Sequence, residues 1–511
     1  MKKTSLATPM AAAMAGAMAL LGGCAVGPDY VRPPLNLPSG YAAASPVPSG
    51  YTAAPPESTQ AEGVPLSHLS PELDVPAQWW QAFRSEPLNA LIVQSLAGNP
   101  NIEAADAALR VAQENEAADR AAFWPSVAAG YSPTRQRVAG AVASPVASNA
   151  NLYTLHTAQV TVSYTPDVFG ATRRQVEGAQ AQTEQQRFQA LAAKLSLSSN
   201  VVAAAITEAS LRAQQRATQA IVADQKEVLQ AYRKQQALGQ VALADVDAQE
   251  ASLAATEATL PPLDKQLAQQ RNLLATLAGR YPGEGVAAHF ELDALQLPAE
   301  LPLTLPSTLV EHRPDVRAAE AQLQAASAAI GVAVAARLPN VTLGVNYGSS
   351  AYTLSQLFKS SSLFWTLAAS VTQPVFDGGA LKHKEAAARA AFDQAAAQYR
   401  ATVLGAFQDV ANTLEAIDAD TRTLQAAVKA ERTASQSLAR TRTQVRLGDA
   451  SALSLRVAQQ ARQQAQLALV QARALRLTDA AALFQALGGG WWNAAPAQLA
   501  DSSHPQKPAQ P

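Results

Sequence analysis

The chain has 511 residues, 48% of them hydrophobic but only 5% aromatic, which is enough apolar side chain for a large folded structure. Its 39 basic and 40 acidic side chains give a net charge of -1, which shows none of the positive excess that is typical of nucleic-acid binding. One cysteine excludes a disulfide framework and a multi-cysteine metal site, and the 6 histidines are too scattered for a metal motif. The sequence therefore predicts no nucleic-acid partner, no metal and no cofactor.

Residues 1–23 have the form of a secretory signal peptide, with two lysines before an apolar stretch. The stretch ends in Leu-Gly-Gly directly before Cys24, which resembles the lipobox of bacterial lipoproteins. This resemblance implies cleavage before Cys24 and lipidation of that residue, and Ala25 in place of Asp implies transport to the outer membrane. A buried structural cysteine is the alternative.

Both ends of the mature chain have the composition of irregular segments. Residues 24–80 are rich in Pro, Ser, Gly and Ala, and we expect a lipidated, extended tether there. Residues 493–511 are similar in composition and are predicted to be a disordered tail. After the signal peptide no continuous apolar run reaches the roughly 20 residues of a membrane-spanning helix, so none is expected.

The region between these ends is an internal duplication, with a first repeat at 81–297 and a second at 298–492. Residues 99–105 return as 313–319, and the Pro-x-Val triplet at 125–127 returns at 339–341 with the same spacing. Each repeat is therefore expected to contain the same elements in the same order.

Four segments alternate between apolar and small polar residues, as strands with one apolar and one polar face do. They are expected at about 126–134 and 155–166 in the first repeat, and at about 340–348 and 363–374 in the second. Four strands cannot close a membrane barrel, whereas three chains would supply an even twelve. A soluble sandwich is the alternative, but it would leave open sheet edges.

After each strand pair comes a proline-free helical stretch, 171–238 and 379–447, long enough to reach roughly 100 Å. Each turns at a glycine, Gly239 or Gly448, and shorter helices are expected to return along it. Pro261-Pro262 should break the first return helix, and the second repeat has no such break.

Several ordered motifs together resemble one family. They are residues 24–30, 167–170 followed by two arginines, 313–323 and 406–410. The set looks like the outer-membrane efflux proteins, the TolC- and OprM-like, NodT-type lipoprotein channels. This resemblance implies a mainly α, internally duplicated homotrimer, with a twelve-stranded barrel in the outer membrane of a Gram-negative bacterium and a long α-barrel in the periplasm. It also implies a periplasmic adaptor (membrane fusion protein) and an inner-membrane pump, of the resistance-nodulation-division class, as partners.

The same resemblance assigns the tips of the long helices to adaptor contact. The expected contact residues are Leu238, Gly239, Gln240, Leu447, Gly448 and Asp449. A plain helix-turn-helix glycine is the alternative at both turns.

The resemblance also implies a gate that closes the channel near the tips. It points to Asp245 as a gate residue, but the positions of its aromatic and basic partners in the family are occupied here by Val445 and Ala450. Arg442 or Arg446 is then the candidate source of the missing charge. The family's acidic constriction also falls on uncharged positions, so Asp449 is a candidate for a substitute ring of three carboxylates, or else a solvated loop residue.

Other functions receive less support from the sequence. It has no phosphate-binding loop, no HExxH and no GxSxG, so no enzyme is predicted. A type I protein-secretion channel or a metal-cation exporter would share the architecture, and a structural coiled-coil lipoprotein would leave the strands unexplained.

Overall fold

The computed structural model describes residues 25–34, 68–70, 73–141, 146, 149–303 and 306–494. The signal peptide, Cys24, much of the expected tether and residues 495–511 lie outside these ranges. The chain forms two compact units. The strand unit contains residues up to Pro33 with Arg110–Gln185 and Ala319–Tyr399, and the helical unit contains Pro34–Leu109, Gln186–Ala318 and the residues from Arg400 onward.

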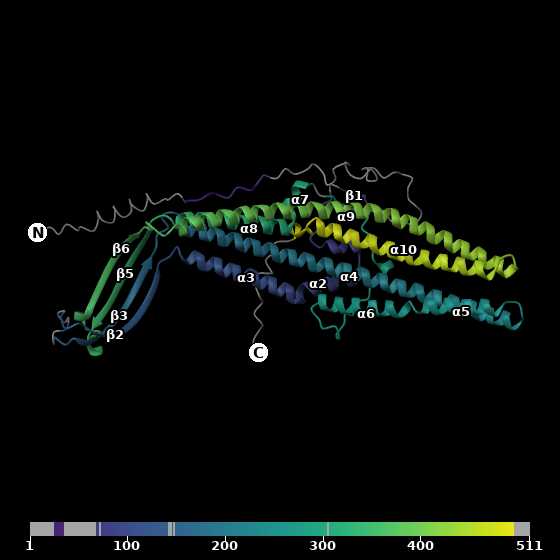
Figure 1. The fold of residues 1–511 in the computed structure, drawn as a ribbon, viewed down its shortest axis with the longest axis horizontal. Helices are drawn as coiled ribbons and strands as arrows, with labels where there is room; N and C mark the ends of the chain where they lie inside the picture. Colours follow the sequence, from purple (N-terminus) through teal and green to yellow (C-terminus); the bar gives the residue numbers. More distant parts are fainter. Residues whose placement is uncertain are drawn as a thin grey trace. The chain divides into compact units, whose positions relative to one another are not determined.

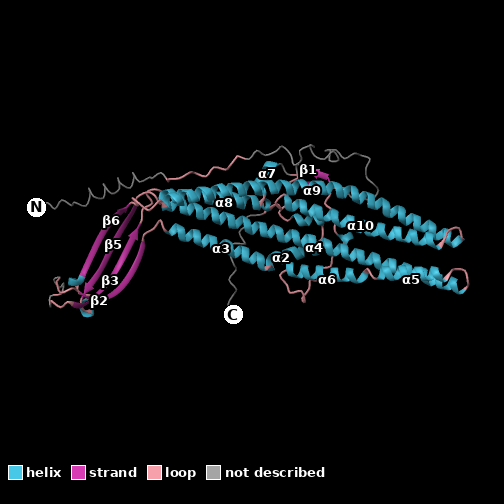
Figure 2. Ribbon diagram, viewed as in Figure 1, coloured by secondary structure: helices cyan, strands magenta, loops and turns pink. Residues whose placement is uncertain are grey.

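The strand unit holds a four-stranded antiparallel sheet in the order β2-β3-β5-β6 (Figure 2). Its strands are β2 (Ser126–Arg137), β3 (Leu152–Tyr164), β5 (Asn340–Ala351) and β6 (Leu363–Thr372). All four overlap the expected ranges. Within the described residues, β2 and β6 are each paired on one side only, so the sheet has two open edges.

The register of this sheet separates an apolar face from a polar face. Val160, Tyr347 and Trp365 lie opposite one another on three neighbouring strands, and their side chains are exposed. The next row contains Thr161 and Asn346, whose side chains are joined by a 2.8 Å hydrogen bond. Successive residues of a strand point to opposite faces, so the two rows lie on opposite sides. An exposed apolar face opposite a polar one is the pattern of a membrane barrel.

Two long helices, α4 (Ala171–Ala237) and α9 (Ala380–Leu447), follow the strand pairs (Figure 1). An aspartate caps the start of each. Asp167 accepts hydrogen bonds from the backbone N–H groups of residues 172 and 173, both at 2.9 Å. Asp377 accepts from residues 379 and 381, at 2.8 and 2.7 Å. A carboxylate satisfies the unpaired donors of the first turn, which explains why both helices begin where the sequence predicts.

The return helices are α5 (Leu243–Glu257) and α6 (Leu260–Leu277) in the first repeat, and the continuous α10 (Ala452–Ala486) in the second. α5 and α6 run back along α4, and α10 runs back along α9 (Figure 1). The expected break is confirmed. Pro261 lies in the first turn of α6, where a missing N–H removes no helical hydrogen bond.

The helical segment that opens each repeat is divided into two helices at a proline. The breaks separate α2 (Glu86–Gly98) from α3 (Pro100–Ala121) and α7 (Pro306–His312) from α8 (Pro314–Ala335). Proline drives the residue before it out of the helical region but fits the first position of a new helix. Thus Pro100 and Pro314 each end one helix and begin another.

The four expected strands form the sheet, and the helical unit adds a short pair that the sequence pattern does not predict. Two further strands, β1 (His68–Ser70) and β4 (Glu300–Pro302), pair in parallel in the helical unit. Nearby, Trp79 and Phe83 are fully buried, and the Trp79 ring stacks on Phe484 with 5.5 Å between ring centroids. The core of this unit therefore begins before residue 81, inside the segment assigned to the tether.

Among the described helices, α4 contains one 18-residue window apolar enough to span a membrane, with a hydropathy of 1.4. Half of that window is buried inside the protein. A core helix passes the same test of length and composition.

Candidate functional site

Both long helices end in the same hydrogen-bonded turn. At the first tip, Gly239 has a φ of 75°, its N–H bonds to Gln236 at 2.8 Å, and the Gln240 N–H bonds to Gln235 at 2.9 Å. This pair of bonds closes a helix with a left-handed residue, the conformation that glycine adopts without a Cβ penalty.

At the second tip, Gly448 has a φ of 83°, and its N–H bonds to Val445 at 3.1 Å. The Asp449 N–H bonds to Gln444 at 2.9 Å. The helix α10 then begins at a different residue, because Ser451 caps it by accepting from the Ser454 N–H at 3.2 Å. Asp449 is therefore an exposed turn residue and not the cap of α10.

The two tips lie at the same end of the helical unit (Figure 1). Leu238 is 72% exposed and Leu447 is 71% exposed. A Cβ placed on Gly239 or Gly448 would meet no atom within 4 Å. The two turns thus combine an exposed leucine with an uncovered glycine backbone, which suits contact with another protein chain.

The candidate gate residue Arg442 forms an ion pair with an acidic residue of the other repeat, Asp224. Its Nη2 lies 3.0 Å from Oδ2 of Asp224 on α4, and Arg462 of α10 lies 3.5 Å from the same oxygen. Asp224 therefore joins α4 of the first repeat to both helices of the second. This three-residue group is called the latch below.

Packing reinforces the latch one helical turn further along α4. Val228 packs against the cluster of α4 and α5 side chains that includes Leu229 and Val246. It also packs against a cluster of α9 and α10 side chains that includes Leu438 and Leu455. Apolar contact and ion pairing thus join the two repeats over the same stretch.

Asp245 lies elsewhere, in the first turn of α5, where it is half-buried. Its charge acts on Tyr232, which is 4% exposed. Burial raises the pKa of Tyr232, Arg456 lowers it and Asp245 raises it. The charges of Asp245 and Arg456 thus both act on an aromatic side chain, Tyr232, which is not at either of the positions that the family pattern implies.

The remaining gate candidates, Arg446 and Asp449, are exposed. No ion pair involves either of them within the described part of this single chain. Their role in a gate stays a prediction.

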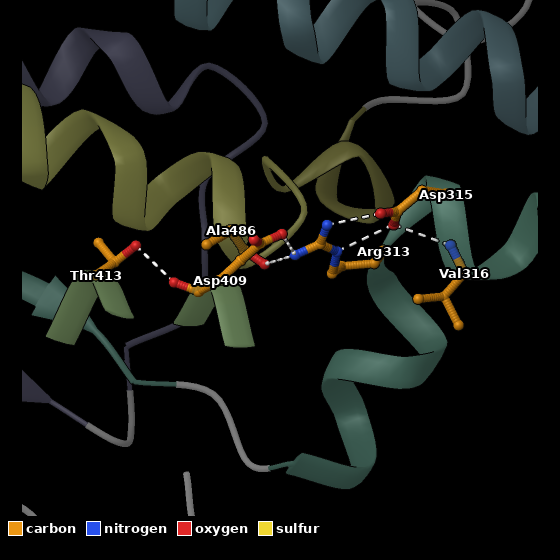
Figure 3. A network of polar contacts seen from close by, with 6 residues as sticks. All are labelled: Arg313, Asp315, Val316, Asp409, Thr413 and Ala486. Atoms are coloured by element: carbon orange, nitrogen blue, oxygen red, sulfur yellow. Dashed lines mark hydrogen bonds and ion pairs between the residues drawn. The ribbon is translucent and has the colours of Figure 1, made fainter. Parts of the chain in front are cut away.

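The duplicated Asn-Pro and Arg-Pro motifs tie each opening helix to the end of a return helix. In the second repeat, Arg313 bonds to Asp315 at 2.6 Å, to Asp409 of α9 at 3.0 Å and to the Ala486 carbonyl of α10 at 3.2 Å (Figure 3). In the first repeat, the Asn99 amide donates to the Leu277 carbonyl at 2.9 Å. The repeated motif therefore closes each repeat on itself.

No group of three or more His, Cys, Asp or Glu side chains in the described ranges is arranged to hold a metal ion. The polar residues described above form ion pairs, caps and turns that join helices.

Comparison with known proteins places this architecture in a family. Residues 91–280 and 305–489 match the family described as outer membrane efflux protein. The pyoverdine export outer membrane protein OpmQ of Pseudomonas putida is 31% identical over 81% of this chain and 88% of its own length. The probable efflux pump outer membrane protein TtgC of P. putida is 30% identical over 93% of this chain and 94% of its own.

A solved structure agrees with these matches. The outer-membrane channel OprN superposes with a TM-score of 0.80 at 27% identity, covering 92% of this chain and 100% of that one. The chain therefore belongs to the outer membrane efflux protein family, a family of outer-membrane channels rather than enzymes.

Proposed function

We propose that this outer-membrane efflux protein works as a lipid-anchored homotrimer, a passive and gated conduit that receives substrate from an inner-membrane pump through a periplasmic adaptor. The observation that carries this proposal is the four-stranded sheet β2-β3-β5-β6 of the strand unit. Within the described residues, its two outer strands are each paired on one side only. Unpaired backbone groups cannot face the hydrocarbon of a bilayer.

Closure by three chains resolves this problem. Three sheets of four strands would make a barrel of twelve, within the even-numbered range of bacterial outer-membrane barrels. The alternating rows around Val160 and Thr161 would then place apolar side chains toward lipid and polar ones toward the lumen. Native mass spectrometry in detergent tests this: three copies are expected, and a stable monomer would refute the barrel argument.

The tips support the adaptor contact, because Leu238 and Leu447 expose apolar surface beside uncovered glycine backbone. The relatives are named for pyoverdine export and for an efflux pump. We therefore propose small molecules as the cargo. The energy source that we propose, an inner-membrane pump of the resistance-nodulation-division class, rests on the family resemblance of the sequence motifs. Type I protein secretion and metal-cation efflux are the alternatives, and a co-transcribed pump gene would distinguish them.

Lipidation at Cys24, which lies outside the described residues, is part of the same proposal. Acyl chains on this residue would hold the trimer in the membrane, since each buried methylene contributes about 0.8 kcal/mol. A clickable fatty-acid analogue should label the wild-type chain but not Cys24→Ser. Labelling of the Ser variant would reject Cys24 as the site.

A further inference from the structure

The residues that directly follow Cys24 are packed against helices of the strand unit, although their composition predicts an extended tether. Residues 25–32, called the arm below, lie along α4 and α8. The arm begins with a backbone hydrogen bond of 3.1 Å from the Val26 N–H to the Phe169 carbonyl. Phe169 lies in the loop between the end of β3 and the start of α4.

Glycines bring the arm into direct backbone contact with this unit. A Cβ on Gly27 would lie 2.4 Å from Cα of Gly331 on α8, and a Cβ on Gly170 would lie 2.6 Å from Cα of Ala25. No side chain fits into such contacts. Gly27 also has a φ of 95°, a conformation that favours glycine.

Arg174 of α4 holds the first half of the arm. Its guanidinium donates to the carbonyl of Val26 at 3.2 Å and to the carbonyl of Gly27 at 3.4 Å. It also pairs with Asp29 at 2.7 Å. The Arg174 side chain is only 6% exposed, so these bonds satisfy a charge that is largely removed from water.

Glu320 of α8 holds the second half. Arg32 donates to both of its carboxylate oxygens, at 2.5 and 2.6 Å, which is the fork geometry of a bidentate pair. The Tyr30 hydroxyl lies 3.5 Å from the same carboxylate. Burial, with the Glu320 charge as the second cause, raises the pKa of Tyr30 to about 12, so the phenol stays protonated and can donate.

We propose that residues 25–32 form a docking arm that fixes the lipid anchor at the junction between strands and helices, and thereby sets where the inner leaflet of the outer membrane meets the channel. This inference rests on the lipidation of Cys24 proposed above. Cys24 directly precedes Ala25 in the sequence, and a Cβ on Gly170 would lie 2.6 Å from Cα of Ala25. A flexible tether of about 50 residues would instead let the anchor range over roughly 40 Å.

Hydrogen exchange in the intact trimer tests the docking itself. The double variant Asp29→Ala, Arg32→Ala changes only the arm, and we expect the Val26 amide to exchange about tenfold faster or more than in the wild type. The control is Arg173→Ala, which removes the neighbouring arginine of α4 and should leave this amide protected. Unchanged exchange in the double variant would overturn the docking arm.

Two insertions of the same flexible Gly/Ser stretch test the role in anchoring. One follows residue 26, with Ala-Val kept after Cys24, and separates the lipid from the remainder of the arm. The other follows residue 34 and lengthens only the tether. We expect at least a fivefold loss of heat-resistant trimer in the outer membrane for the first insertion and normal levels for the second.

Equal trimer levels for the two insertions would contradict the anchoring role. Fatty-acid labelling of the same samples separates the hypotheses: an unlabelled wild-type chain would reject the lipidation, whereas a labelled chain with equal trimer levels would reject the arm alone.

Discussion

Arg442 of α9 lies 3.0 Å from Asp224 of α4, and this ion pair joins the second repeat to the first near the tips. Its side chains are 41% and 38% exposed, and an isolated pair of this kind contributes at most about 1 kcal/mol. Arg462 adds a second positive charge at 3.5 Å. The free energy needed to break the latch is therefore small, as a gate at this position would require.

Replacing Asp224 with Ala should open the latch, because Arg442 and Arg462 would lose their shared acceptor and repel each other. We expect cells with Asp224→Ala to admit a large hydrophilic dye several times faster than wild-type cells at equal trimer levels. The control is Glu250→Ala, which breaks the pair between Glu250 and Arg233 within the first repeat. Equal dye entry in the Asp224 variant and the control would reject the latch as a gate.

Gly448→Trp should block adaptor docking and spare the trimer. A Cβ at this position meets no atom within 4 Å, so the local cost is the left-handed backbone, about 1 kcal/mol or more. Efflux of a fluorescent dye in cells with the cognate pump should fall at least fivefold, with normal heat-resistant trimer. Gly448→Ala has the same backbone strain without the bulk and should keep most of the efflux. Loss of the trimer would make Gly448 a structural residue, and normal efflux would remove the tip from the docking site.

Arg313→Ala should destabilise the helical unit, because one arginine bonds to α9, to the end of α10 and to Asp315. Its side chain is 12% exposed, whereas its carboxylate partners are partly solvated. We therefore expect a loss of about 1 to 3 kcal/mol, measured by denaturant unfolding. Arg389→Ala removes a pair within one helix in which the arginine is 58% exposed, and Glu385 keeps its other partner, Arg337, so the change should cost about 0.5 kcal/mol or less. Equal losses for the two variants would contradict a joining role for Arg313.

Asp479 should make stability depend on pH. Burial, followed by the neighbouring Asp420, raises the pKa of Asp479 from 3.8 to about 7, while Arg476 acts against this shift. Between these two pH values the folded chain holds a proton that the unfolded chain releases. The contribution of Asp479 to the free energy of unfolding is therefore complete below about pH 4 and is lost as the pH rises through 7. The decrease in unfolding temperature from pH 5 to pH 8 should be smaller in Asp479→Asn. Asp418→Asn is the control, and an identical decrease in Asp479→Asn would contradict the prediction.

The long helices and the sheet could be predicted because their signals are local. Proline-free stretches end at glycines with positive φ, and apolar alternation marks β2, β3, β5 and β6. The two strands of three residues, β1 and β4, are too short for any periodicity to show. The helix breaks at Pro100 and Pro314 can be predicted from the sequence, because proline starts a helix more readily than it continues one.

The latch and the arm could not be predicted because their partners are remote in sequence. Asp224 and Arg442 are 218 residues apart, and Arg32 and Glu320 are 288 residues apart. A charged side chain on a helix face usually lies in solvent, so nothing in the sequence marks Asp224 and Arg442 as a pair. A segment rich in Pro and Gly is usually a linker, so nothing marks the arm as packed. Only the packing of α4 against α9 and α10, and of the arm against α4 and α8, gives these residues their roles.

Ion current across a planar bilayer tests the central claim most directly, because a channel must conduct without any added energy source. We expect purified wild-type trimer to give small discrete current steps, and Asp224→Ala to give steps of larger conductance. Trimer of either kind that inserts into the bilayer and yields no steps would contradict the account.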